Sequence, residues 1–156
     1  MKIAFDFVAT QKGSGTKSYI INFCNKIHKI DRKHELYVYL CENYLKEVDK
    51  NLKKLPNIKF IPKPNYLTNI LLRIIWMQFI LPFELKLKKI NILYSPMNIS
   101  PIICKILNIK NILVLHSNLP WKFFNLMPGN YFRNIITKKL MELSIYQSDI
   151  AIKSDL

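Results

Sequence analysis

Polar side chains suited to ligand binding follow two short apolar runs in the second half of the sequence. Residues 92–94 and 112–115 have the composition of buried parallel strands. The polar residues that come directly after them are Ser95, Asn98, His116, Ser117 and Asn118. In an open α/β sheet, ligands bind outside the carboxyl ends of the strands. The sequence therefore predicts a ligand site where these two strands end.

The polar residues at the strand ends allow more than one interpretation. The His116 imidazole can contact a ligand or transfer a proton, and it can equally be a hydrogen-bonded structural group. The Asn98 amide has donors and an acceptor for sugar hydroxyls, and it can instead close a turn before Pro101. Trp121 follows Pro120 in a predicted loop and is the best candidate for a partly exposed aromatic side chain, which could stack on a sugar or pack against a partner domain.

A glycine-containing loop, Gly13-Ser14-Gly15-Thr16, separates the first predicted strand from the first predicted helix. Backbone N–H groups at a helix N-terminus attract anions, and glycine keeps side chains out of the way, so a diphosphate suits this position. The spacing is not that of a dinucleotide fingerprint, because residue 18 is Ser, and it is not that of a P-loop. The alternative is a plain turn in which Thr16 caps the helix.

Predicted strands and helices alternate along the chain. Strands are predicted at residues 2–8, 35–41, 58–61, 92–94, 111–115 and 149–153. Helices are predicted at residues 16–30, 42–55 and 65–89, as a short helix or turn at 101–107, and from the Asn130 cap to Gln147, with a loop at 117–129. This alternation predicts an α/β fold, a Rossmann-like parallel sheet with helices on both faces. The 156 residues make one domain by size.

The predicted helix at residues 65–89 has three further features. Thr68 is its expected N-cap. Pro82 lacks an N–H group and crowds the preceding turn, so we expect a break near Leu81 and a second short helix at residues 83–89. The apolar side chains at its centre are predicted to be core packing rather than a binding stripe: Trp76, Met77, Phe79 and Ile80.

Cysteine usage and charge limit the classes of protein. Cys24, Cys41 and Cys104 are odd in number and far apart, which argues against a disulfide framework or a zinc site and for small core residues in a reducing compartment. The net charge is +14, from 24 basic and ten acidic residues. An anionic ligand or membrane surface, nucleic acid, or a merely lysine-rich composition would each account for it. No nucleic-acid-binding motif is present, so no nucleic-acid partner is expected.

The N-terminus has no signal-peptide pattern, and the apolar run at residues 70–83 is shorter than the roughly 20 residues of a spanning helix. A cytoplasmic protein is expected, with peripheral contact at the inner face of the membrane.

Several segments, in order, resemble the N-terminal domain of family 4 glycosyltransferases of the GT-B fold. They are KIAFDF, the loop KGSG, TKSYIINFCNKI, LLRIIWMQFILPFELKLKKINILYSP, NISP, VLHSNLPW and KLMELSIYQSDIAIKSDL. The resemblance covers essentially the whole chain. It implies the first half of a GT-B fold, and the second, nucleotide-sugar-binding domain is absent from these 156 residues.

The resemblance also implies an activity and roles for residues. Such enzymes move a sugar from a nucleotide-sugar to a glycan or lipid-linked acceptor with retention of configuration, without a metal or other cofactor. Gly13 and Gly15 match the loop that approaches the donor diphosphate, and His116 matches a strand-end histidine that faces the donor sugar. Many relatives have His-Asp-Leu where this chain has His116-Ser117-Asn118, so a role for that Asp has no counterpart here.

By this resemblance the chain is the acceptor-binding half of an enzyme and is inactive alone. A companion C-terminal domain or chain is expected to complete it. The alternative hypothesis is a stand-alone basic module that binds an anionic membrane or nucleic acid.

Overall fold

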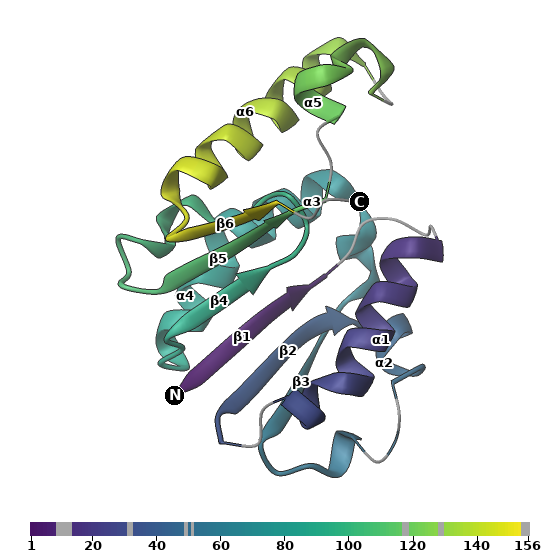
Figure 1. Ribbon diagram of the computed structural model, residues 1–156, viewed down its shortest axis with the longest axis vertical. Coiled ribbons are helices and arrows are strands. Elements are labelled where there is room, and N and C mark those ends of the chain that lie inside the picture. The colour runs from purple at the N-terminus through teal and green to yellow at the C-terminus, as the bar shows by residue number, and fades with distance from the viewer. Residues whose placement is uncertain are drawn as a thin grey trace.

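Six parallel strands form one sheet in the order β3-β2-β1-β4-β5-β6 (Figure 1). The computed structural model describes residues 1–8, 14–30, 33–48, 50, 52–116, 119–127 and 130–153, except for the side chains of 14–17, 28–30, 52, 119 and 126. The strands are β1 (Lys2–Phe7), β2 (Glu35–Cys41), β3 (Ile58–Lys63), β4 (Ile92–Ser95), β5 (Lys110–Leu115) and β6 (Ile150–Lys153). All five neighbouring pairs are parallel, which confirms the predicted α/β, Rossmann-like fold.

The helices lie between consecutive strands. They are α1 (Ser14–Ile30), α2 (Glu42–Leu45), α3 (Ile70–Ile75), the π-helical turn η3 (Trp76–Ile80), α4 (Leu81–Leu87), α5 (Leu119–Lys122) and α6 (Tyr131–Gln147). Short 3₁₀ turns occur at η1 (Leu52–Lys54), η2 (Asn65–Thr68), η4 (Ile102–Cys104) and η5 (Phe124–Leu126).

Strand β1 shows how the sheet separates two helical layers. Phe5 and Phe7 point to one face, where their rings pack against Phe23 of α1 at centroid distances of 5.3 and 5.1 Å. Asp6, between them, points to the other face and meets Arg73 of α3. Side chains alternate between the faces of a strand. Both faces of the central strands are therefore buried, as the predicted helices on both faces require.

The predicted helix at residues 42–55 is wrong beyond its first turn. After α2, the N–H groups of Glu47 and Val48 bond the carbonyl groups three residues back, at 3.0 and 3.3 Å. Such tight bonds end an α-helix. The strand predicted at residues 58–61 extends to Lys63 through Pro62. Because β3 is an edge strand, the missing N–H of Pro62 leaves no gap in the sheet.

The segment before β4 is helical as predicted, with a different start. Its second short helix begins next to Pro82 as predicted, but follows the preceding turn without a break. Asn69, not Thr68, caps α3: its Oδ1 accepts hydrogen bonds from the N–H groups of Leu71 and Leu72 at 3.0 and 3.4 Å. The Thr68 hydroxyl instead donates to Asn65 O. Near Pro82, η3 leads directly into α4, which accepts Pro82 in its first turn, where an N–H is dispensable.

The segment after β5 corrects one prediction and confirms another. Residues 117–129 were predicted as a loop, and α5 and η5 lie within them. Asn130 caps α6 as predicted, its Oδ1 accepting from Arg133 N–H at 2.8 Å.

Replacing this cap residue, Asn130→Ala, is expected to lower the free energy of unfolding by about 1 kcal/mol, because one N–H of the first turn of α6 loses its acceptor. In a domain of this size that corresponds to a melting temperature lower by about 2–4 °C. Asn125→Ala, at an exposed position just before α6, is the control. Equal melting temperatures for the two variants would contradict the role of the cap.

The three cysteines are free and buried, as predicted. Burial raises the pKa of Cys24 and Cys104 to about 12 and that of Cys41 to about 11. These thiols therefore stay protonated at neutral pH and act as small apolar side chains of the core.

Candidate ligand-binding site

The strand order changes direction at the middle of the sheet, between β1 and β4. From β1 the chain moves towards β2 and β3, whereas β4 lies on the other side of β1 and leads to β5 and β6. The connections therefore diverge above the carboxyl ends of β1 and β4 (Figure 1). Such a switch point is where open α/β sheets bind ligands. Val8, the start of α1 and the residues after β4 and β5 share this edge.

Asn98 ties the two strand-end segments together. Its Oδ1 accepts a hydrogen bond from the backbone N–H of His116 at 2.6 Å, and its own N–H donates to Val114 O at 3.3 Å. The backbone of Asn98 has a φ of 61°, a left-handed conformation that Asn tolerates better than most residues. The amide thus holds His116 in place instead of closing a turn before Pro101.

Two tyrosines that no motif in the sequence marks complete a cluster around His116. The Tyr19 ring of α1 lies edge-on to the His116 ring at 5.5 Å, and its hydroxyl is 3.1 Å from that of Tyr94 on β4. Burial, together with Tyr94, raises the pKa of Tyr19, so the phenol stays protonated at neutral pH. The predicted helix at residues 16–30 does not indicate this contact, because the contact across the switch point depends on the strand order.

The other predicted site residues fall into three groups. Gly13, Ser117 and Asn118 lie outside the described residues. Ser14, Gly15 and Thr16 form the first turn of α1, so the helix begins two residues before its predicted start, at this same edge. Ser95 is fully buried at the end of β4, and Trp121, in α5, is 36% exposed as predicted for an aromatic side chain near the surface.

A buried ion pair lies beneath the end of β1. Asp6 Oδ2 is 3.6 Å from Arg73 Nη2, with side-chain exposures of 0% and 6%. Arg73 Nε donates to Val8 O, and Asp6 Oδ1 accepts from Val8 N–H. Burial raises the pKa of Asp6, while Arg73 and the Val8 N–H oppose that rise. The pair attaches α3 to the last described residue before the glycine-containing loop. The sequence feature that indicates this pair is Asp6 itself, because an acidic side chain within a buried strand needs a cation nearby.

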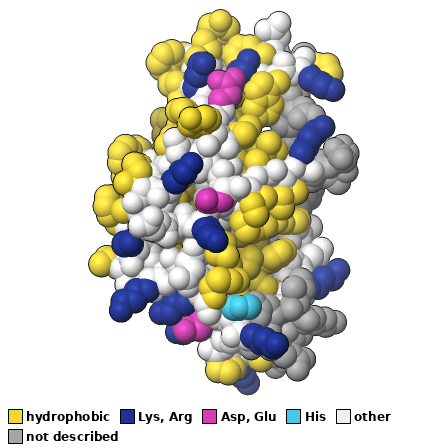
Figure 2. All heavy atoms as spheres, turned by 60° about the vertical axis from the view of Figure 1, so that its left-hand side comes forward, with side chains coloured by type: hydrophobic (Ala, Val, Ile, Leu, Met, Phe, Trp, Pro, Cys, Tyr) yellow, Lys and Arg dark blue, Asp and Glu magenta, His cyan; other side chains and the backbone are white. Residues whose placement is uncertain are grey.

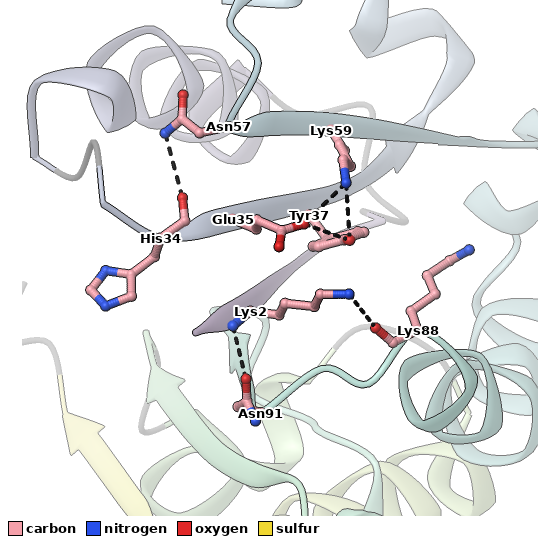
Figure 3. A network of polar contacts seen from close by, with 8 residues as sticks. All are labelled: Lys2, His34, Glu35, Tyr37, Asn57, Lys59, Lys88 and Asn91. Carbon is pink, nitrogen blue, oxygen red and sulfur yellow. Dashed lines mark hydrogen bonds and ion pairs between the residues drawn. The ribbon is translucent and has the colours of Figure 1, made fainter.

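A second polar network lies at the opposite, amino-terminal edge of the sheet (Figure 3). The Glu35 carboxylate accepts hydrogen bonds from Tyr37 and Lys59, which hold the pKa of Glu35 below its ordinary value. Lys2 donates to Asn91 Oδ1 through its backbone N–H and to Lys88 O through Nζ. These contacts join β1, β2 and β3 to the turn before β4, so their role is structural.

A hollow of about 440 Å³ opens at that same amino-terminal edge, lined by Met1, Asn91, Ile92, Asn108 and Lys110. Its lining offers two amides and one ammonium group. No imidazole, thiol or carboxylate lines it, which leaves the carboxyl-terminal edge as the better candidate for chemistry.

The groups at the carboxyl-terminal edge are an imidazole, two phenols, an amide and the N-terminus of α1. They suit a polar ligand or a phosphate. Among the described residues, no group of three or more His, Cys, Asp or Glu side chains could hold a metal ion. Over the same residues, no helix combines the length and the apolar character needed to cross a membrane.

Comparison with known proteins does not assign the chain to a family. No family model matches the chain, and no curated protein matches it.

Proposed function

We propose that this chain is the acceptor-side domain of a family 4, GT-B-type glycosyltransferase that moves a sugar from a nucleotide-sugar to a glycan or lipid-linked acceptor with retention. The domain binds and positions, and a companion domain or chain that holds the nucleotide-sugar is needed for turnover. No metal or other cofactor is part of the proposal.

The observation that carries this proposal is the position of His116. The resemblance matches this residue to a histidine that faces the donor sugar. The residue lies beside the switch point of a six-stranded parallel sheet, with its ring against Tyr19 of α1. Asn98 and Tyr19 orient it from two other elements. A ligand with hydroxyls and a diphosphate would find an imidazole and helix N–H groups at one edge.

The coding sequence around this chain provides the first test. A second Rossmann-like domain with a nucleotide-sugar site is expected in frame after codon 156, across a frameshift, or in an adjacent gene. If none of the three places encodes such a domain, the glycosyltransferase proposal fails.

His116→Ala is expected to lower kcat for sugar transfer by about 100-fold in the assembly of both halves, because the reacting sugar loses one oriented polar group. The melting temperature is expected to change little, since His116 is only partly buried and lies at a strand end. His34→Ala, at the opposite edge of the sheet in Figure 3, is the control and should keep full activity. Unchanged kcat in His116→Ala would assign His116 a purely structural role.

A further inference from the structure

The helical segment from α3 to α4 is apolar on both its inner and its outer side. Four large inner side chains lie in the core: Trp76, Met77, Leu81 and Leu85. Seven large side chains on the outer side are 43–83% exposed, and we call them the outer stripe: Leu71, Leu72, Ile75, Phe79, Ile80, Phe83 and Leu87. A helix that is apolar all round is normally buried on all sides. In this structure, the outer side of the segment is uncovered.

The π-helical turn η3 keeps the outer stripe on one side. In an unbroken α-helix, side chains spaced four residues apart drift by about 40° per step, and Leu71 and Leu87 would face nearly opposite directions. The wider i→i+5 turn takes back part of that drift. Contacts on the inner side hold this orientation, because Arg73 meets Asp6 and the Gln78 amide bonds Ser100 O and Ile102 N–H.

The whole net charge lies in the part of the chain that contains the outer stripe. Residues 50–141 hold 15 of the 24 basic residues and one of the ten acidic residues, Glu84. The rest of the chain holds nine of each sign, so the net +14 belongs to this central part. Glu84 is itself paired, with Lys63 at 2.7 Å and Lys88 at 3.8 Å. Within residues 50–141, the single acidic side chain is therefore paired with two lysines.

Exposed lysines surround the C-terminal end of the outer stripe. Lys86 and Lys89 are exposed beside Leu87, and Lys86 Nζ donates to Leu107 O, which brings the residues that follow η4 alongside α4. Those residues include the exposed Lys105 and Ile106. Figure 2 shows hydrophobic side chains along the left margin of the molecule with Lys and Arg side chains below and between them. Apolar and cationic groups thus share one surface.

We propose that the outer stripe seats this protein on the surface of an anionic lipid bilayer, with α3, η3 and α4 lying in the plane of the interface. Apolar side chains enter the acyl boundary while Lys86, Lys89 and Lys105 contact anionic headgroups. A second copy is a poorer occupant, because it would bring a second surface of the same sign. Proteins that bind single-stranded nucleic acid stack its bases on aromatic side chains, whereas five of the seven residues of the outer stripe are aliphatic. This proposal stands apart from the glycosyltransferase proposal.

Vesicle flotation tests the proposal on the 156-residue chain. Wild-type protein is expected to float with vesicles of phosphatidylcholine and phosphatidylglycerol at 7:3, to float less as salt rises, and to bind pure phosphatidylcholine much more weakly. Equal binding to both vesicle types, or no binding to either at low salt, would overturn it.

Paired variants assign the surface. Phe79→Ser/Phe83→Ser is expected to lower the vesicle partition coefficient at least about tenfold, because two exposed rings no longer enter the lipid. Leu143→Ser/Tyr146→Ser removes two exposed apolar side chains next to the acidic Glu142 of α6 and should bind as wild type does. Circular dichroism confirms that both variants fold. An equal loss of vesicle binding in both double variants would show that the outer stripe is not the surface that binds the bilayer.

A second pair tests the charges. Lys86→Gln/Lys89→Gln is expected to weaken binding to the anionic vesicles by about 30-fold, from about 1 kcal/mol per lysine. Lys26→Gln/Lys46→Gln, from the electrically balanced part of the chain, should have little effect.

Sedimentation velocity on the same proteins tests whether a second copy covers the outer stripe. A salt-resistant dimer that Phe79→Ser/Phe83→Ser dissociates would overturn the bilayer proposal. The bilayer proposal would also be overturned if the wild type bound RNA but no vesicles, and Phe79→Ser/Phe83→Ser still bound RNA.

Discussion

Arg73→Met is expected to lower the free energy of unfolding by about 3–5 kcal/mol, because it leaves the buried Asp6 carboxyl group without its cation. Asp6 is fully buried and Arg73 is 5% exposed, so water cannot replace the lost partner. The same change leaves Val8 O without the hydrogen bond from Arg73 Nε. Urea denaturation of both proteins measures the difference.

The loss in Arg73→Met should depend on pH. The pKa of Asp6 is already raised above 3.8 in the folded protein, and removing Arg73 takes away an influence that lowers it. A raised carboxyl pKa means that the folded state holds its proton more firmly than the unfolded state. The free energy of unfolding then falls as pH rises from the pKa of Asp6 in the unfolded state through its pKa in the folded state. The difference from wild type should be largest at neutral pH and should shrink as pH falls towards 4.

Two further variants separate the ion pair from general damage to the helix. Asp6→Asn/Arg73→Met removes both charges and should recover more than half of the lost stability. Arg133→Met, on α6, replaces an arginine outside the pair and should cost less than about 1 kcal/mol. A pH-independent loss in Arg73→Met of similar size to that in Arg133→Met would contradict the buried pair.

Gln78→Met is expected to lower the free energy of unfolding by about 2 kcal/mol, because Met keeps the volume of the side chain but none of its hydrogen bonds. Gln78 is buried, its Nε2 donates to Ser100 O at 3.1 Å, and its Oε1 accepts from Ile102 N–H at 3.0 Å. Ser100 also bonds Ser144 of α6 and Asn111 of β5. The variant therefore weakens the junction of η3, η4, α6 and β5.

Hydrogen exchange locates this effect. The amide of Ile102 should exchange faster in Gln78→Met, whereas amides in β1 and β2 should change little under native conditions. Gln147→Met, at the end of α6, is the matched control and should leave the exchange of Ile102 unchanged. An unaltered Ile102 amide in Gln78→Met would show that the bridge does not stabilise this junction.

Much of the fold could be predicted from local pattern. Short apolar runs bounded by polar turns marked the strands, and Asn130 marked the start of α6, because a cap acts within one turn of chain. Predictions failed where two local choices were close in energy. Thr68 and Asn69 are adjacent candidate caps, and residues after Leu45 have helical composition in a connection that tightens into turns.

The candidate site was predictable in its location and only partly in its contacts. A histidine after an apolar run indicated the carboxyl edge of a sheet, and the structure places His116 there. Tyr19 and Tyr94 are 75 residues apart, and no local pattern indicates that their hydroxyl groups meet. The exposure of Phe79 and Ile80 was also predicted wrongly, because hydropathy does not distinguish a side chain facing the core from one facing outward.

The sequence alone determined the alternation of strands and helices, the polar strand ends and the excess of basic residues, because each follows from the identity and spacing of neighbouring residues. The strand order, the pairing of Asp6 with Arg73, the cluster around His116 and the uncovered outer stripe were decided by the tertiary structure. Each of these depends on which strands pair and on which side of the sheet a helix packs. Those outcomes come from minimising the exposed apolar surface of the whole chain at once, so no single segment contains them.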